Sequence, residues 1–231
     1  MKPIIIIPAY QPDNTLLLLL EQLVEQTNNK IIVIDDGSDS ACQPIFNRAD
    51  NYSAVHVLSH RANQGKGAAL RTGFRYILAE EGSCNTVITA DADGQHRAED
   101  IAKIIDGCGD HPHHLILGVR QFTGYVPLRS RFGNSLTRYL YNLLFHQNLR
   151  DTQTGLRGIP VHTLDALIDL QGERYCYELE MLLRLTQLKV PVLEISISTV
   201  YERNNSSSHF RPLHDSAQIY TTLFKWWLKH R

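Results

Sequence analysis

Short apolar runs, each followed by a polar cluster, recur along the first half of the chain and constrain its fold more than any other feature. The runs cover residues 4–7, 31–34, 55–58, 86–89 and 115–119. Such continuous apolar runs are typical of strands buried on both faces, as in a parallel sheet. After the first run, Asp13 or Asn14 can cap a helix in which Leu16, Leu20 and Leu23 share one face. This β-α-β repetition predicts a mostly parallel sheet covered by helices.

Polar clusters follow several of these predicted strands at their carboxyl ends. They occupy residues 8–10, 35–38 and 91–96. In open α/β sheets, ligands bind at the edge where the strands end. We therefore expect these clusters, although distant in sequence, to form one site.

Asp91 and Asp93 end the fourth run and are followed by Gly94, Gln95 and His96. Carboxylates two residues apart on an extended segment point the same way and repel unless a cation lies between them. Mg²⁺ and Mn²⁺ commonly share one or two carboxylates with substrate phosphates. By itself the motif is more typical of a polar turn, but its position at the end of a buried strand favours a metal and diphosphate site.

Three other polar features each allow two interpretations. The segment 35–38 reads Asp-Asp-Gly-Ser, which either forms a type I turn or supplies a carboxylate that binds a nucleobase or ribose. The glycines around Lys66 lack the spacing of a phosphate loop or a dinucleotide fingerprint, so the segment either starts a helix or brings Lys66 to a diphosphate. Arg120, Arg129 and Arg131 are either surface charges or a cluster that binds phosphate.

The second half of the chain contains fewer regular patterns. A helix is expected over 172–184, with Glu178 and Glu180 on different faces, because residues two apart diverge on a helix. A strand is expected over 190–197, continuing toward Tyr201, and a helix from Asp215 onward. Around Trp226 that last helix combines aromatic and basic residues, which suits either a membrane interface or docking on the core.

Length and charge exclude some classes of protein. With 231 residues, the chain is expected to form one domain, with a ligand-binding half at 1–118 and a second half at 119–231. Lys and Arg number 23 and Asp and Glu 24, which argues against a nucleic-acid binder. The four cysteines form no C-x-x-C pair, and no apolar run approaches the roughly 18 residues of a spanning helix. We expect a cytoplasmic protein, soluble or peripheral at the inner face of the membrane.

Several motifs in order resemble the family 2 glycosyltransferases, and among them the small polyprenyl-phosphate (dolichol-phosphate) mannosyl or glucosyl synthases. The motifs are IIIIPAYQPDNTL, IIVIDDGSDS, NQGKGAALRTGF, ADADGQH, DTQTGLRGIP, YELEMLLR and SSSHFRPLHDS. The resemblance covers nearly the whole chain. It implies the GT-A fold, an α/β architecture with a Rossmann-like, mostly parallel sheet and helices on both faces.

The resemblance also implies roles for individual residues. The metal, Mg²⁺ or Mn²⁺, would be held by Asp91, Asp93 and Gln95. Glu178 would lie in the acceptor cleft. The nucleotide-sugar would be bound by Pro8, Tyr10, Asp36, Lys66, Asp91, Ala92, Asp93, Gln95, Arg203 and Arg211, and the acceptor by Arg120, Arg131 and Ser135.

Some positions depart from the family pattern. Gln11 and Pro12 follow Tyr10, where the dolichol enzymes have an Asn-Glu pair, and Gly94 replaces a bulkier residue. Both changes leave the donor open between GDP- and UDP-sugars. The chain also lacks the Gln-x-x-Arg-Trp signature of processive synthases, so repeated elongation is not expected.

The expected activity is an inverting, metal-dependent transfer of a sugar from a nucleoside-diphosphate sugar to a polyprenyl phosphate. The arginines favour a phosphate acceptor, which is already largely ionised at neutral pH and needs no base. The alternatives are a glycosyltransferase that uses Glu178 as base toward a glycan hydroxyl, and a non-catalytic sugar-nucleotide-binding protein. The expected partners are the nucleotide sugar, the lipid phosphate and a membrane surface, with a homodimer left open and no nucleic acid.

Overall fold

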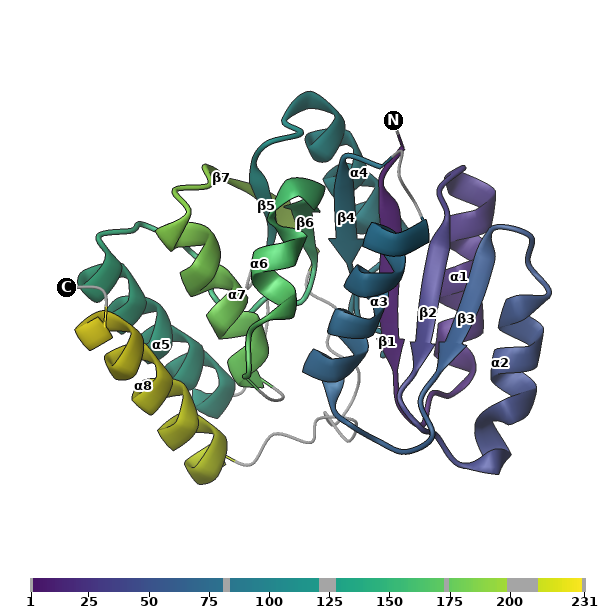
Figure 1. Cartoon of the computed structure of the whole chain (residues 1–231), viewed down its shortest axis with the longest axis horizontal. Coiled ribbons are helices and arrows are strands. Elements are labelled where there is room, and N and C mark those ends of the chain that lie inside the picture. Colours follow the sequence, from purple (N-terminus) through teal and green to yellow (C-terminus); the bar gives the residue numbers. More distant parts are fainter. Residues whose placement is uncertain (1, 81–83, 121–127, 173–174, 199–211, 230–231) are drawn as a thin grey trace.

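The computed structural model describes residues 2–80, 84–120, 128–172, 175–198 and 212–229 (Figure 1). Within this part of the chain, seven strands form one sheet. The strands are β1 (Ile4–Ala9), β2 (Ile31–Asp35), β3 (Val55–Ser59), β4 (Thr86–Thr89), β5 (Leu115–Arg120), β6 (Arg157–Pro160) and β7 (Val192–Ile197). Their order across the sheet is β3-β2-β1-β4-β6-β5-β7.

Helices connect the strands and cover both faces of the sheet. They are α1 (Asn14–Gln26), α2 (Gln43–Asp50), α3 (Lys66–Glu80), α4 (Ala98–Asp110), α5 (Leu128–Phe145), α6 (Leu164–Ile168), α7 (Tyr175–Gln187) and α8 (Pro212–Lys229), with short 3-10 turns at Ser40–Cys42 and Val161–Thr163. The predicted α/β class is confirmed, and the five runs named from the sequence are the strands β1 to β5.

Alternation along β1 explains why its whole run is apolar. Ile4 and Ile6 belong to the core on the side of α3, α6 and α7, whereas Ile5 and Ile7 belong to the core under α1, α2 and α4. All four side chains are buried. A strand covered on both faces has no position that favours a polar residue, which is the reason for its continuous hydrophobic sequence.

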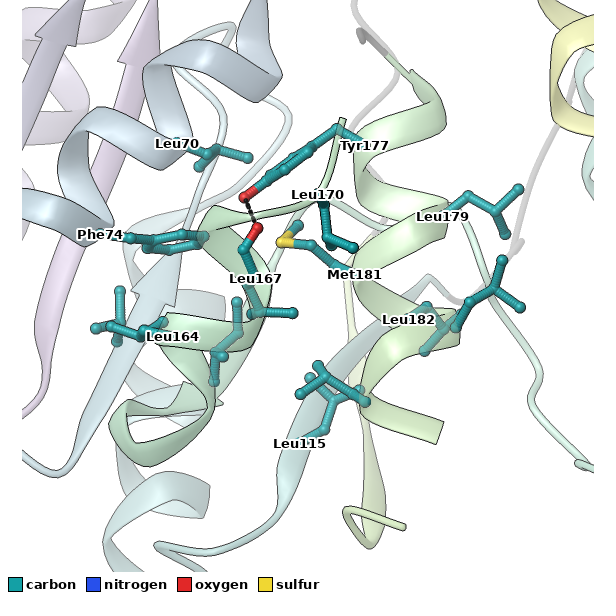
Figure 2. Packing of buried hydrophobic residues seen from close by; sticks show 14 of the residues in the cluster. Leu70, Phe74, Leu115, Leu164, Leu167, Leu170, Tyr177, Leu179, Met181 and Leu182 are labelled. Carbon is teal, nitrogen blue, oxygen red and sulfur yellow. Dashed lines mark hydrogen bonds between the residues drawn. The ribbon is translucent and has the colours of Figure 1, made fainter. Parts of the chain in front are cut away.

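Aromatic and branched aliphatic side chains fill the core beneath α3, α6 and α7 (Figure 2). Phe74 from α3 and Tyr177 from α7 are fully buried there. The Tyr177 hydroxyl donates to the Leu167 carbonyl at 3.0 Å, so its one polar atom is satisfied. This packing attaches α7, which carries Glu178, firmly to the first half of the molecule.

One strand departs from the parallel order. β6 lies between β4 and β5 and runs antiparallel to both, while the remaining pairs are parallel. Its four residues, Arg-Gly-Ile-Pro, show neither an apolar run nor alternation, and the sequence did not predict it. The insertion of β6 places the segment before it, residues 151–156, beside the end of β4.

The helix boundaries agree with the sequence in most places. Asp13 caps α1 by accepting from the Thr15 amide at 2.8 Å, as predicted. The helix predicted over 172–184 is α7, and the C-terminal helix starts at Pro212 rather than Asp215. The predicted extension of β7 toward Tyr201 lies outside the described residues. No helix in the described ranges is long and apolar enough to cross a membrane.

Candidate active site

The carboxyl ends of β1, β2 and β4 meet at one edge of the sheet. Ala9 at the end of β1 pairs with Asp35 at the end of β2, and Ile6 of β1 pairs with Thr89 at the end of β4. The residues that follow these strands therefore emerge along the same edge. The predicted convergence of the three polar clusters is confirmed in this sense.

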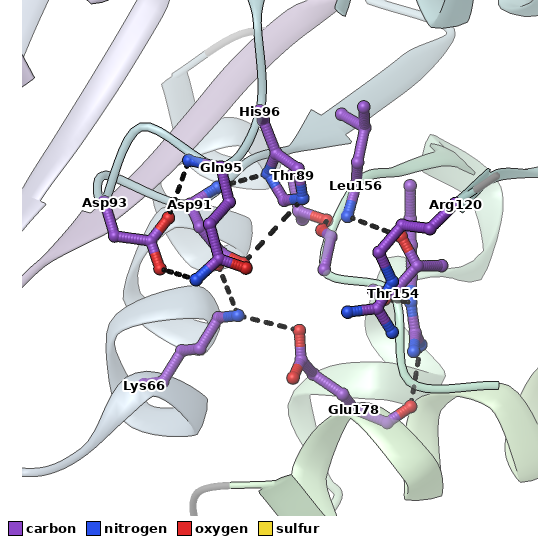
Figure 3. Close-up of polar contacts among 12 residues, drawn as sticks. Lys66, Thr89, Asp91, Asp93, Gln95, His96, Arg120, Thr154, Leu156 and Glu178 are labelled. Atoms are coloured by element: carbon purple, nitrogen blue, oxygen red, sulfur yellow. Dashed lines mark hydrogen bonds and ion pairs between the residues drawn. The ribbon is translucent and has the colours of Figure 1, made fainter. Parts of the chain in front are cut away.

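At this edge, Asp91 contacts Lys66 through its carboxylate and His96 through its backbone (Figure 3). Its Oδ1 lies 2.5 Å from Lys66 Nζ, and its backbone N–H donates to His96 Nδ1 at 2.9 Å. Burial alone would raise the pKa of Asp91, but the charges of Lys66, His96 and Arg120 outweigh it and lower the pKa to about 2. Asp91 is therefore ionised at neutral pH.

Lys66, the first residue of α3, joins the two halves of the site. Its Nζ contacts Asp91 Oδ1 and also donates to Glu178 Oε1 at 2.9 Å (Figure 3). Burial would lower the pKa of Lys66, but the two carboxylates raise it well above its ordinary value. The ammonium group is thus permanently charged and connects the end of β4 with α7.

Asp93 lies beside Asp91 in a different environment. Its Oδ1 accepts from the Gln95 backbone N–H at 3.1 Å, and its Oδ2 accepts from Gln95 Nε2 at 2.8 Å. Burial and the neighbouring charge of Asp91 raise the pKa of Asp93. A cation between the two carboxylates would remove this repulsion.

The donor set at Asp91 and Asp93 fits a hard divalent cation. Carboxylate oxygens and the Gln95 amide oxygen are the ligand types that Mg²⁺ and Mn²⁺ take. Among the described residues, no group of three or more His, Cys, Asp or Glu side chains is placed to hold a metal alone.

Gly155, in the loop before β6, provides the space for Asp91. A Cβ added to this glycine would lie 2.5 Å from Asp91 Oδ2 and 3.1 Å from Oδ1. The Gly155 carbonyl accepts from Thr89 Oγ1 at 2.8 Å, which fixes the loop against the end of β4. Sequence reasoning missed this residue, because the contact joins segments more than sixty positions apart.

Asp36 uses both carboxylate oxygens within the protein. Its Oδ1 lies 2.7 Å from His60 Nδ1 and accepts from the Gln64 amide at 3.0 Å, while Oδ2 accepts from the Gly65 amide at 2.7 Å. The carboxylate therefore holds the loop that leads into Lys66. Its expected contact with a nucleotide stays a prediction.

The far side of the site, across from Asp91, is built from the end of β5, the segment before β6 and α7. Arg120, at the end of β5, donates through Nε to Asp151 at 2.8 Å and through Nη2 at 3.2 Å. Asp151 is fully buried, so this two-bond contact fixes the orientation of the guanidinium. Glu178 is held from two sides, since its backbone carbonyl accepts from Arg157 Nη1 at 2.7 Å while its carboxylate contacts Lys66.

Arg157 is a buried cation that sequence reasoning did not single out. Its side chain is fully buried and donates to the carbonyls of Thr154, Glu178 and Thr152 at 2.8, 2.7 and 3.4 Å. Burial lowers the pKa of Arg157. By binding carbonyls on both sides, this guanidinium connects the loop before β6 with the first turn of α7.

The remaining predicted residues are placed as follows. Pro8 and Ala92 are half-buried and Tyr10 is exposed at the same sheet edge. Glu180 accepts from the Gly172 amide at 2.9 Å, away from Lys66, so the prediction that the two glutamates diverge is confirmed. Arg131 and Ser135 belong to α5, but their side chains are outside the described part, and Arg203 and Arg211 lie in the undescribed segment 199–211.

Comparison with known proteins agrees with this geometry. The undecaprenyl-phosphate mannosyltransferase of Micrococcus luteus is 29% identical over 209 residues, which cover 87% of this chain and 84% of that protein. The UDP-N-acetylglucosamine–dolichyl-phosphate N-acetylglucosaminyltransferase of Methanococcus voltae is 29% identical over 216 residues, covering 85% of each.

Solved structures show the same fold. Glucosyl-3-phosphoglycerate synthase from Mycobacterium tuberculosis, in complex with Mn²⁺, uridine diphosphate and phosphoglyceric acid, superposes with a TM-score of 0.73 at 17% identity, covering 98% of this chain and 78% of that one. At this identity the likeness shows the GT-A fold alone. The model of the family described as Glycosyl transferase family 2 matches residues 4–165, well over half of the chain. The chain therefore belongs to glycosyl transferase family 2.

Proposed function

We propose that this protein is an inverting, metal-dependent glycosyltransferase that moves a sugar from a nucleoside-diphosphate sugar to a polyprenyl phosphate. One observation carries the proposal: Lys66 contacts both Asp91, on the donor side, and Glu178, on the acceptor side. The relatives named above, which act on undecaprenyl or dolichyl phosphate, support the class of acceptor.

On the donor side, Asp91, Asp93 and Gln95 would hold Mg²⁺ or Mn²⁺. The ion, when bound, supplies positive charge against the diphosphate of the donor. Asp91 is ready for this role because its pKa is about 2. Lys66 adds a second positive charge beside the same carboxylate and lies where the sugar diphosphate would approach.

On the acceptor side, Arg120 would bind the lipid phosphate, held in orientation by Asp151. A phosphate monoester is mostly ionised at neutral pH, with a second pKa of about 6, so its oxygen can attack without a base. The new bond forms on the face of the anomeric carbon opposite the diphosphate, as the sugar–diphosphate bond breaks. Glu178, ion-paired with Lys66, would help place the donor and acceptor together.

A second candidate acceptor is a glycan hydroxyl, for which Glu178 would serve as the base. The position of its carboxylate in the first turn of α7, buried and directed to Lys66, favours this alternative. A base would have to exchange its contact with Lys66 for the acceptor hydroxyl. The two acceptors therefore make opposite demands on Glu178.

Two substitutions separate these alternatives. With undecaprenyl phosphate as acceptor, we expect Glu178→Gln to keep activity within about tenfold, because glutamine still offers Lys66 an oxygen. Arg120→Lys keeps the charge beside Asp151 but loses the forked geometry, and should lower kcat/KM for the acceptor by about a hundredfold. Glu180→Gln, on the same helix but outside the site, is the matched control. A native protein that transfers to a glycan but not to undecaprenyl phosphate, with complete loss in Glu178→Gln and normal activity in Arg120→Lys, would identify a hydroxyl acceptor.

The donor and the metal can be tested without an acceptor. A thermal-shift screen of GDP, UDP and their sugars, with Mg²⁺ or Mn²⁺, reports which ligand binds the folded protein. We expect the shift to depend on the metal and to disappear in Asp91→Asn. A shift that is independent of metal would favour a non-catalytic sugar-nucleotide-binding protein.

With a lipid acceptor, the protein would work at the inner face of the membrane as a peripheral enzyme.

A further inference from the structure

Helices α5 and α8 lie side by side at one end of the molecule (Figure 1). Both helices expose large apolar side chains. The exposed fractions are 37% for Leu136, 63% for Tyr139 and 56% for Leu143 on α5, and 47% for Phe224 and 68% for Leu228 on α8. We call these five residues the α5–α8 face. Five large apolar residues on two adjacent helices are a concentration that a soluble surface rarely shows without a partner.

The exposed residues form stripes that are separate from the core-facing sides of the two helices. Leu136, Tyr139 and Leu143 follow the spacing i, i+3, i+7, and Phe224 and Leu228 follow i, i+4, so each set lies on one side of its helix. The inward sides are already supplied by other residues, which are buried: Thr137, Tyr141, Ile219 and Leu223. Both helices are therefore apolar on the outside as well as on the inside.

Within residues 136–145 of α5 and 218–229 of α8, every charged residue is basic. Residues 136–145 and 218–229 contain no Asp or Glu, although acidic and basic residues are balanced over the whole chain. The basic residues are Arg138 on α5 and Lys225 and Lys229 on α8, and both lysines are exposed. Apolar and aromatic side chains with cations and without acids suit the interface of an anionic bilayer.

A second copy of the chain fits this surface less well. In a two-fold dimer, the same patch meets itself, so the cations of one protomer would face those of the other without acidic partners. Like charges brought together across an interface oppose association. An anionic lipid surface instead provides the opposite charge and an apolar layer at the correct depth.

The two tryptophans contribute less to this surface than the sequence implied. Trp226 is half-buried and packs against the core. The guanidinium carbon of Arg184 lies over its indole ring, 5.3 Å from the ring centroid. The interpretation of the C-terminal helix as docked on the core is confirmed for one side of α8, and its contact with a membrane stays a prediction. One side of α8 docks on the core through Ile219 and Leu223, and the other side exposes Phe224 and Leu228.

We propose that the α5–α8 face docks the protein on an anionic lipid bilayer. The inference rests on the proposed function, because α5 follows β5, whose last residue is Arg120, and so connects the acceptor side of the site with this face. The docking itself requires neither acceptor nor donor and can be measured without them.

The test uses full-length protein and vesicles of phosphatidylcholine with or without phosphatidylglycerol, lacking polyprenyl phosphate. Binding is followed by sedimentation and by the emission of the two tryptophans, both on α8. We expect binding only to the phosphatidylglycerol vesicles, weakening with salt. Leu143→Ser/Leu228→Ser should reduce partitioning about a hundredfold, since each leucine loses its burial in the lipid. Leu18→Ser/Leu188→Ser is the matched control, because these leucines are exposed on α1 and just after α7.

The outcomes also separate this inference from the proposed function. Equal binding of the two double variants, or no binding of the native protein, would overturn the docking surface. Binding that appears only after undecaprenyl phosphate is added to neutral vesicles would also overturn it, while leaving the proposed acceptor intact. A dimer in light scattering that Leu143→Ser/Leu228→Ser dissociates would show that a second copy covers the face. Thermal unfolding of each variant, with single Leu228→Ser as a milder form, checks that the fold is retained.

Discussion

Replacing Gly155 by alanine should disable the site while leaving the protein folded. The added Cβ would lie 2.5 Å from Asp91 Oδ2, whereas ordinary contacts begin at 3.4 Å. The carboxylate must therefore move by up to about 0.9 Å, the difference between these two distances. Because Asp91 Oδ1 also contacts Lys66 at 2.5 Å, that movement disturbs the ion pair as well.

The expected cost falls mainly on activity. A displacement of about 1 Å in a catalytic arrangement can cost about a hundredfold in rate. Overpacking typically costs about 1–3 kcal/mol of stability, and the loss of glycine entropy in the unfolded chain offsets about 0.4–1 kcal/mol of that. The atoms that the new Cβ would displace are the side-chain carboxylate of Asp91 and not backbone. We therefore expect a cost at the lower end of the range, with a net loss in the free energy of unfolding below about 2 kcal/mol.

Three measurements check this reasoning. Sugar transfer should fall about a hundredfold, metal-dependent binding of a nucleoside diphosphate should weaken, and the urea unfolding curve should move only slightly. Gly109→Ala is the matched control, because a Cβ at that position on α4 has no neighbour within 4 Å. The interpretation of Gly155 as the space for Asp91 is refuted if Gly155→Ala and Gly109→Ala have the same activity and metal dependence.

Three further substitutions or treatments have distinct expected outcomes. Arg157→Leu removes the side-chain donor from three carbonyls and should lower the free energy of unfolding by about 3–5 kcal/mol in urea melts. A loss under about 1 kcal/mol would contradict the role of Arg157 in joining the loop before β6 to α7. Asp151→Asn weakens the charge-assisted contacts that orient Arg120, so it should raise KM for the acceptor about tenfold and leave KM for the donor almost unchanged. Equal changes in the two KM values would argue against a role of Arg120 in acceptor binding. Burial raises the pKa of the Cys108 thiol to about 12, so at about pH 8 iodoacetamide should label it only after unfolding, as followed by mass spectrometry; rapid labelling of the native protein would show that α4 opens.

The parallel part of the sheet could be predicted because burial on both faces leaves a strong mark in the sequence. Ile4 to Ile7 or Ile31 to Ile34 cannot be mistaken for surface segments, and the polar residues after them follow from the strand ends. The position of Asp91 and Asp93 at the carboxyl ends of the strands could be predicted in the same way. Local sequence was sufficient because each of these features is set by neighbours within a few residues.

The contacts that complete the site depend on distant segments, and no local pattern encodes them. Lys66 meets Glu178 across 112 positions, whereas the sequence around Lys66 left open a helix start or a diphosphate contact and indicated no carboxylate partner. β6 was missed because Arg157 occupies a buried position where an apolar residue is expected. A buried arginine is compatible with the interior only through carbonyls supplied by other elements, which become visible once the fold is known.

The antiparallel strand β6 also limits how the molecule can move during turnover. Its backbone hydrogen bonds join β4, which is followed by Asp91 and Asp93, to β5, which ends at Arg120. Within the described residues, the strand end that leads to Asp91 and the strand end at Arg120 therefore belong to one hydrogen-bonded sheet. A motion that separated Arg120 from Asp91 would have to break these hydrogen bonds, so we expect the distance between the two side chains to stay the same through turnover.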